Sequence, residues 1–229
     1  MTDATLTSSA QRLRDPQRWR KAMLDLALFF MAGLVLTTLI SRFLPGYPIL
    51  VATPSIDTGV YWLNKKVRHF YPGDFVTFPF APGKGFEWLT ERYGEHRIHT
   101  KKVLGVAGDT VFADSKGHLR VCRFGMPDRC VPAGVPQGAD SKGQLMPAWV
   151  PPNHQYTLQT GELWVYGQNA KSLDSRYHGP VRTEAVKGKA SLLLRWAAVP
   201  ADPADVISDE VFSAVRWDDN SIPSPSGAQ

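Results

Sequence analysis

The chain has 229 residues, of which 43% are hydrophobic and 21% charged, a composition typical of a globular protein rather than a disordered one. This length allows one ordinary domain together with an anchor and a tail. The formal net charge is +5, but the body shows no basic stripe interleaved with aromatic residues, so we expect no nucleic-acid partner. The 19 glycines and 18 prolines favour a turn-rich, mainly β body over a helical bundle.

The N-terminal part of the chain reads as a basic segment, residues 1–21, followed by an apolar segment, residues 22–44. The run Leu26–Ile40 contains no charge, and only Asp25 and Arg42 interrupt the apolar segment near its ends. A helix of about 20 residues crosses the ~30 Å hydrocarbon layer of a membrane. A cleaved secretion signal is the alternative, but no small-x-small cleavage site follows. We therefore predict an uncleaved transmembrane signal-anchor helix over 22–44.

Charge sets the expected direction of this anchor. Basic residues before a first transmembrane helix tend to stay in the cytoplasm, and this chain has five of them: Arg12, Arg14, Arg18, Arg20 and Lys21. The sequence therefore predicts a single-pass protein of the bacterial inner membrane, with a cytoplasmic N-terminus and a periplasmic body. Membrane lipid is one of its expected partners.

The body, residues 46–200, contains short β-like runs that are bounded by Gly and Pro turn signals. The runs are Gly59–Leu63, Asp74–Phe78, Ile98–Leu104, Thr110–Ala113, Leu119–Cys122, Leu163–Tyr166 and Ala190–Trp196. They predict a mainly β domain of antiparallel sheets. We expect Val131–Pro152 to be a loop-like insertion. Residues 201–229 are expected to form a short helix that begins at Asp202, followed by a disordered tail.

Two cysteines, Cys122 and Cys130, flank a short polar loop. In a cytoplasmic protein they would be two unrelated buried thiols, whereas outside the cytoplasm a disulfide that closes the loop is the better interpretation. The spacing alone leaves both open.

Three blocks of sequence carry candidate chemistry: ATPSIDTGVY at 52–61, HTKKVLGVAGDTV at 99–111 and GELWVYGQNAKSLDSRYHGPV at 161–181. Each alone has an ordinary interpretation, as a turn serine, a solvated lysine pair or a local ion pair. In this order they resemble the type I signal peptidase family, whose motifs are a serine near the membrane, K-[KR]-x-x-G-x-x-G-D, and G-x-N-x-x-S-x-D-S-R-x-x-G. The likeness covers about residues 50–192. Within the family, the short chain, the single anchor and the S-x-x-x-G-x-Y pattern are most similar to the TraF-type conjugative-transfer peptidases.

This resemblance implies a Ser–Lys dyad with Ser55 as the nucleophile and Lys101 as its general base. A serine hydroxyl becomes a good nucleophile when a neighbouring base takes its proton, and a lysine can do this only when it is neutral. Burial beside Val103 and Leu104 could lower the lysine pKa from its usual value of about 10.4. Because neighbours along a strand point to opposite faces, Lys102 is expected to face solvent or lipid headgroups.

Four further residues have roles that the resemblance implies. The Thr53 hydroxyl and the Ser55 backbone N–H would stabilise the oxyanion, Ser172 would orient the lysine, and Asp174 and Arg176 would structure the site as an ion pair. No cofactor and no metal are expected, since the six histidines show no recognisable ligand spacing.

The substrate that the resemblance implies is an exported precursor protein. The likeness to the TraF-type branch implies a conjugative pilin subunit, whose leader is cleaved and whose ends are joined in some family members. Other conjugation or secretion components would then be partners. Departures from the family pattern at Ile56, Asp57 and Gln168 bear on substrate choice. Two alternatives stay open: a general type I signal peptidase, and a non-catalytic membrane-tethered β domain of an export or conjugation apparatus.

Overall fold

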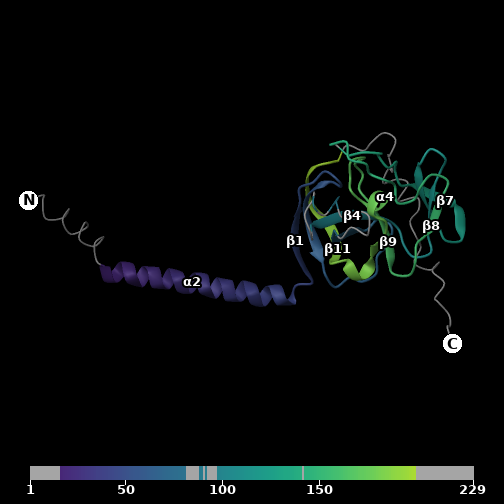
Figure 1. Ribbon diagram of the computed structural model, residues 1–229. Coiled ribbons are helices and arrows are strands. Elements are labelled where there is room, and N and C mark those ends of the chain that lie inside the picture. The colour runs from purple at the N-terminus through teal and green to yellow at the C-terminus, as the bar shows by residue number, and fades with distance from the viewer. Residues whose placement is uncertain (1–15, 81–87, 90, 92–96, 141, 200–229) are drawn as a thin grey trace, which may run out of the picture. The chain divides into compact units, whose positions relative to one another are not determined.

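The computed structural model describes residues 16–80, 88–89, 91, 97–140 and 142–199 (Figure 1). The chain divides into two compact units, Met1–Pro45 and Gly46–Gln229, and each is described by itself. The expected helix at Asp202 and the tail after it lie outside the described residues.

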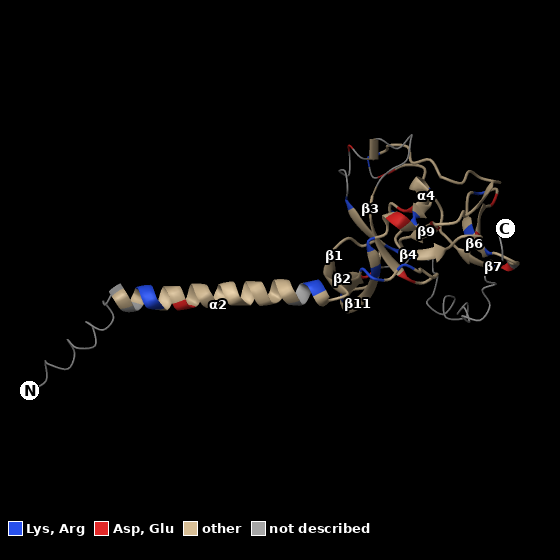
Figure 2. Cartoon of the chain, turned by 90° about the horizontal axis from the view of Figure 1, so that it is seen from below, with Lys and Arg blue, Asp and Glu red and all other residues tan. Residues whose placement is uncertain are grey.

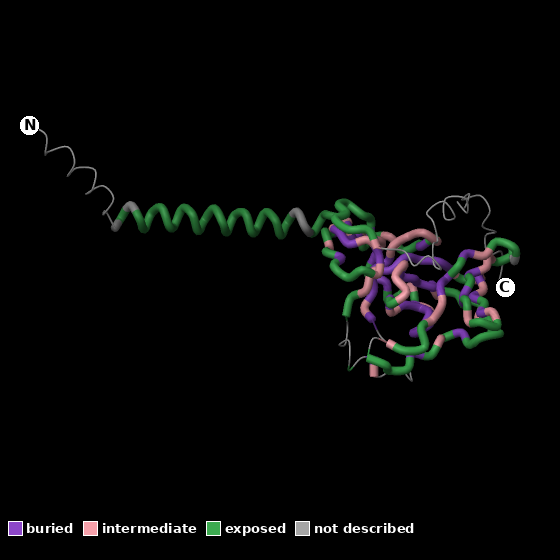
Figure 3. The backbone as a smooth tube through the Cα atoms, turned by 90° about the horizontal axis from the view of Figure 1, so that it is seen from above, coloured by how far each residue is buried: buried purple, intermediate pink, exposed green. Residues whose placement is uncertain are grey.

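The described part of the first unit is one helix, α2 (Pro16–Phe43). Its segment Trp19–Leu39 is 21 residues long and is long and apolar enough to cross a membrane. Where burial is described, the residues of this helix are exposed (Figure 3), and the charged residues that Figure 2 marks lie toward its ends. Two polar side chains within the apolar segment are satisfied internally, because the hydroxyls of Thr37 and Thr38 donate to the carbonyls of Gly33 and Leu34, each at 2.7 Å. This helix fits a membrane anchor.

The second unit is mainly β, as predicted, and consists of two antiparallel sheets. The larger sheet has the strand order β1-β2-β11-β3-β4-β9-β10. Its strands are β1 (Gly46–Val51), β2 (Thr58–Asn64), β3 (Phe75–Pro79), β4 (Ile98–Gly105), β9 (Glu162–Tyr166), β10 (Val181–Arg182) and β11 (Gly188–Ala197). A 3-10 turn, η1 (Thr183–Ala185), follows β10.

The smaller sheet has the order β7-β6-β5-β8. It is formed by β5 (Thr110–Ala113), β6 (Leu119–Arg123), β7 (Met126–Pro132) and β8 (Gln155–Thr157). Cys122 and Cys130 face each other across β6 and β7 and are joined by a disulfide. The expected loop-like insertion Val131–Pro152 therefore begins in a strand, since Val131 and Pro132 belong to β7. Its described residues after Pro132 are loop-like, apart from an isolated β-bridge between Ala139 and Leu145.

Apolar side chains from both sheets form the core of this unit. One cluster joins Val111, Val121 and Leu158 of the smaller-sheet region to Trp164 and Tyr166 of β9. A second cluster packs against the other face of the central strands, around Val76, Val103 and Val165. Consecutive residues of β4 and β9 are buried and alternate between the two clusters, so these two strands lie between two apolar layers. They are the strands that position the candidate site.

A short helix, α4 (Ser175–His178), follows β9 and is entirely buried. Asp174 caps it, because its carboxylate accepts a hydrogen bond from the backbone N–H of Arg176. The segment 167–174 between β9 and α4 reaches β4, where the Ser172 Oγ accepts a hydrogen bond from Lys101.

Candidate active site

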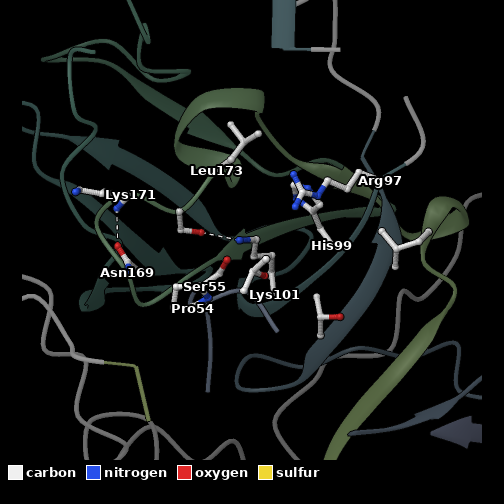
Figure 4. A pocket seen from close by; sticks show the side chains of 12 residues that line it. Pro54, Ser55, Arg97, His99, Lys101, Asn169, Lys171 and Leu173 are labelled. Carbon is white, nitrogen blue, oxygen red and sulfur yellow. Dashed lines mark hydrogen bonds between the residues drawn. The ribbon is translucent and has the colours of Figure 1, made fainter. Parts of the chain in front are cut away.

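A pocket in the second unit gathers residues from three segments that are distant in sequence (Figure 4). The loop between β1 and β2 contributes the first group, β4 and the residue before it the second, and the segment between β9 and α4 the third. The lining residues are Thr53, Pro54, Ser55, Arg97, Ile98, His99, Thr100, Lys101, Asn169, Lys171, Ser172 and Leu173. The residues expected at positions 53, 55, 101 and 172 thus line one pocket.

Lys101 lies in the middle of β4, opposite Val76 of β3, and is only 3% exposed. Its Nζ donates a hydrogen bond of 2.6 Å to the Ser172 Oγ, which is also buried. Burial lowers the pKa of Lys101 from 10.5 to about 8; the charges of Arg176 and Arg97 add to this effect, and the Asp174 carboxylate opposes it. A lysine in this environment carries a substantial neutral fraction near pH 8.

Asp174 and Arg176 form a fully buried, bidentate ion pair beside the lysine. Arg176 Nε lies 2.9 Å from Asp174 Oδ1, and Arg176 Nη2 lies 3.0 Å from Asp174 Oδ2. The same guanidinium donates to the Asn169 carbonyl at 3.0 Å and packs 4.8 Å from the centre of the Tyr166 ring. Burial by itself would raise the pKa of Asp174, but Arg176 outweighs it and holds that pKa below its usual value. The pair therefore stays charged and structures the segment around it.

Gly167 makes the approach of Ser172 to the lysine possible. A Cβ on residue 167 would lie 2.0 Å from the Ser172 Oγ, which is an impossible contact. The Gly167 N–H donates 2.8 Å to Asp174 Oδ2, so the ion pair also fixes this glycine. Only glycine at 167 leaves room for the Ser172 hydroxyl that Lys101 contacts.

Ser55 lies in the loop between β1 and β2 and is half-buried, next to the fully buried Ile56. Figure 4 shows the Ser55 and Lys101 side chains pointing toward each other in the pocket. Two contacts hold the loop just after the serine: the Tyr61 hydroxyl donates to the Asp57 carbonyl at 2.8 Å, and the Asp57 carboxylate accepts from Arg195 at 3.0 Å. The pocket thus brings a hydroxyl to a buried amine.

The two groups expected to donate hydrogen bonds to an oxyanion are the Ser55 N–H and the Thr53 hydroxyl. The Ser55 N–H donates to the Thr53 carbonyl at 2.8 Å, an i to i+2 bond that closes a tight turn around Pro54. Thr53 itself lines the pocket and is exposed. The N–H expected to bind an oxyanion therefore already has an acceptor in this structure.

The expectation that Lys102 faces solvent or lipid was wrong. Lys102 is 6% exposed, because it lies inside the sheet with Phe75 of β3 on one side and Tyr166 of β9 on the other. Strand alternation correctly separates the two lysines, but in a central strand both faces are covered.

Several lining residues were not predicted from the sequence to belong to the site, above all Arg97 and His99. A signal was present, since strand period two places residues 97 and 99 on the same face as Lys101. The segment Ile98–Lys101 also has a free edge: it pairs with β3 on one side, whereas β9 pairs with β4 only from Lys102 onward. Among the described strands, none covers this second edge.

Two of the histidines, His99 and His178, pack around Phe80, with ring centroids 5.0 Å and 5.7 Å from the Phe80 ring. Burial lowers the pKa of His99 to about 3 and that of His178 to about 4. Both imidazoles are therefore neutral near pH 7. Within the described ranges, no group of three or more His, Cys, Asp or Glu side chains is placed to hold a metal ion.

Comparison with known proteins decides the family. A family model described as signal peptidase, peptidase S26, matches residues 19–196. The chain belongs to the signal peptidase family. No curated protein has a sequence that matches it. Membership implies a serine-type signal peptidase, a hydrolase whose substrates are precursor proteins, and the matched range includes both the apolar helix and the pocket.

Proposed function

We propose that this signal peptidase family member is a membrane-anchored endopeptidase that cleaves leader segments from exported precursors with a Ser55–Lys101 dyad. The observation that carries the proposal is the buried Lys101 amine, bonded to Ser172 and lining the same pocket as the Ser55 hydroxyl. Family membership independently supports serine-type peptidase chemistry.

The chemistry follows from the state of the amine. Neutral Lys101 accepts the Ser55 proton while the Ser55 Oγ attacks the scissile carbonyl, giving a tetrahedral oxyanion and an ammonium. The ammonium then returns the proton to the leaving amine as the peptide bond breaks, leaving an ester on Ser55. Water, deprotonated by the same lysine, hydrolyses this ester and restores the enzyme. The bond to Ser172 keeps the amine oriented through these steps.

The oxyanion requires donors that point at it. The Ser55 N–H is proposed to exchange the Thr53 carbonyl for the substrate oxyanion, and the Thr53 hydroxyl is proposed as the second donor. Both groups lie at the pocket, where Thr53 is exposed and Ser55 is half-buried.

The free edge of β4 supplies a binding mode for the precursor. An extended segment can add to an open strand edge through main-chain hydrogen bonds, which read backbone rather than side chains. Residues Ile98–Lys101 offer such an edge within the pocket, and it ends at the proposed base. This arrangement suits cleavage of many related leader segments in extended conformation.

The membrane topology belongs to the same proposal. The basic residues before the apolar helix favour a cytoplasmic N-terminus, so the catalytic unit would lie in the bacterial periplasm. The disulfide between Cys122 and Cys130 is consistent with an oxidising compartment.

The finer substrate assignment is a conjugative pilin precursor. It rests on the S-x-x-x-G-x-Y pattern, whose glycine and tyrosine pack beside the loop that carries Ser55. A Cβ on Gly59 would lie 2.1 Å from the Leu194 carbonyl oxygen. Tyr61 is fully buried, and its hydroxyl donates to the Asp57 carbonyl. If an amine of the cleaved chain replaces water in the last step, the product is a cyclic pilin. Its mass would be lower by one water than that of the linear product.

The direct test uses the full chain in detergent with a propilin and, separately, a general secretory precursor. Ser55→Ala and Lys101→Met should each reduce cleavage by about 10³-fold or more, and the double variant should add little because the two residues act as a unit. Ser115→Ala and Lys116→Met are matched controls in an exposed turn between β5 and β6, and should cleave normally. Normal cleavage by either dyad variant would refute the mechanism.

A further inference from the structure

The pocket contains a row of side chains that the proposed mechanism does not use. Arg97, just before β4, and His99 and Lys101 in its N-terminal half alternate along the chain and line the pocket together. In Figure 4 the Arg97 and His99 side chains lie next to each other, on the opposite side of Lys101 from Lys171. An exposed guanidinium thus lies at one end of the row and the buried amine at the other.

The charged residues that line the pocket beside this row are all basic. Its middle member, His99, is neutral near pH 7 because burial lowers its pKa to about 3. The pocket is lined by the cations Arg97, Lys101 and Lys171, and no carboxylate is among its described lining residues. The Asp174 carboxylate, whose charge acts on Lys101, is bonded to Arg176. An anionic group on a bound precursor would therefore meet the positive charge of these described lining residues.

We propose that Arg97 is a specificity-determining residue that binds an Asp or Glu side chain of the precursor near the cleavage site. The inference rests on the proposed peptidase function, and it names a feature of the substrate. Arg97 directly precedes the free edge of β4, so a precursor strand that pairs with Ile98–Lys101 must pass it. A guanidinium is well suited to a carboxylate, because it offers paired donors in a planar fork.

The position of the acidic residue follows from strand geometry. Arg97 precedes Lys101 by four residues, which is about 13 Å along an extended chain at roughly 3.3 Å per residue. The scissile carbonyl lies at the Lys101 end of the row. The acidic residue should therefore be the third to fifth residue from the scissile bond, on the side of the cut that runs along β4.

The test uses purified full-length enzyme and a series of peptides with one cleavage site. Glu, Gln or Lys is placed three, four or five residues before the cut, and then after it, and kcat/KM is measured at low and at high salt. The wild-type enzyme should cleave one set of Glu peptides about five- to tenfold more efficiently than the matching Gln peptides. High salt should shrink this preference, since Arg97 is exposed.

Variants assign the preference to one residue. Arg97→Gln should abolish the Glu-over-Gln ratio of kcat/KM, and Arg97→Glu should transfer the preference to the Lys peptide, which a misfolded variant could not do. The ratio is compared within each variant, because the Arg97 charge also lowers the pKa of Lys101 and its loss changes the cleavage of all peptides. Arg120→Gln is the matched control, because Arg120 is an exposed arginine on β6 of the other sheet. Lys171→Gln tests the cation at the other end of the pocket.

The possible results distinguish failure of the Arg97 assignment from failure of the proposed peptidase function. Equal cleavage of Glu and Gln peptides by the wild type, or a preference that Lys171→Gln removes and Arg97→Gln keeps, would overturn the Arg97 assignment while leaving the peptidase function standing. No cleavage of any peptide or protein precursor would instead overturn the proposed function, and this inference with it.

Discussion

The two halves of the proposed dyad lie in contrasting surroundings. On the lysine side, Lys101, Ser172, Asp174 and Arg176 are all buried; Lys101 bonds to Ser172 at 2.6 Å and Arg176 to Asp174 at 2.9 Å. On the serine side, Thr53 and Pro54 are exposed and the loop is held from behind, by Tyr61 and Arg195. The difference indicates a division of labour: the lysine side is built to tune a pKa, and the serine side is built to admit a substrate.

Removing the acid of the buried pair should have the largest effect on stability. Asp174→Ala leaves the Arg176 charge and the Gly167 N–H without the carboxylate that they contact. Loss of one partner of a buried pair typically costs about 3–5 kcal/mol of unfolding free energy. Denaturant unfolding of the catalytic unit would measure it, with the exposed Asp128→Ala on β7 as control. A cost under about 1 kcal/mol would show that the pair does not organise the lysine side.

Lys101→Met should do the opposite and stabilise the protein at pH 7. The folded-state pKa of Lys101 is lowered from 10.5 to about 8, so below pH 8 folding must bury a charged amine. The shift corresponds to about 3 kcal/mol, an order-of-magnitude figure. Between pH 8 and 10.5 the unfolded state binds more protons, so wild-type stability rises with pH there and the advantage of the variant should fade. The measurement is unfolding free energy against pH for both proteins; a constant difference would exclude a depressed lysine pKa.

Asp57→Ala should have the smallest effect on stability and a selective effect on activity. It removes the acceptor for Arg195 and for the Val199 N–H, both at 3.0 Å, from a partly exposed loop. We expect a loss of about 1 kcal/mol or less in stability and a several-fold fall in kcat/KM, with the lysine titration unchanged. Steady-state kinetics with Asp128→Ala as control tests this. A shifted titration would show that the two sides are not independent.

The sequence predicted the strands in the interior of both sheets and missed those at their edges. The strands β2, β3, β4, β9, β11, β5 and β6 were each anticipated, whereas β1, β10, β7 and β8 were not, and these four are the edges of the two sheets. Edge strands tolerate proline and can be short, which weakens the pattern that alternation provides. Pro48 in β1 and Pro132 in β7 illustrate the first case, and the two-residue β10 the second.

The candidate site could be predicted as a set of residue types, but not as an environment. The motifs named residues 55, 101 and 172 because each motif is a local pattern of residue types, and the structure lines one pocket with these three residues. Burial of Lys102 and the engagement of the Ser55 N–H by Thr53 depend on strand neighbours and loop geometry that no motif encodes. Arg97 was missed because its proposed role in substrate binding depends on the free edge of β4, and that edge exists only once the sheet is formed.

Titration of Lys101 tests the central claim most directly. The pH dependence of kcat/KM reports the free enzyme, and the Lys101 amine can be followed in parallel by NMR of labelled lysine, with Lys101→Met to assign the signal. We expect the amine to titrate near pH 8 and kcat/KM to rise about tenfold per pH unit below that value and then level off, because the neutral amine is the active form. His99 should not contribute, since its pKa is about 3. An amine that titrates near 10.5, or activity that is flat between pH 6 and pH 9, would contradict the account.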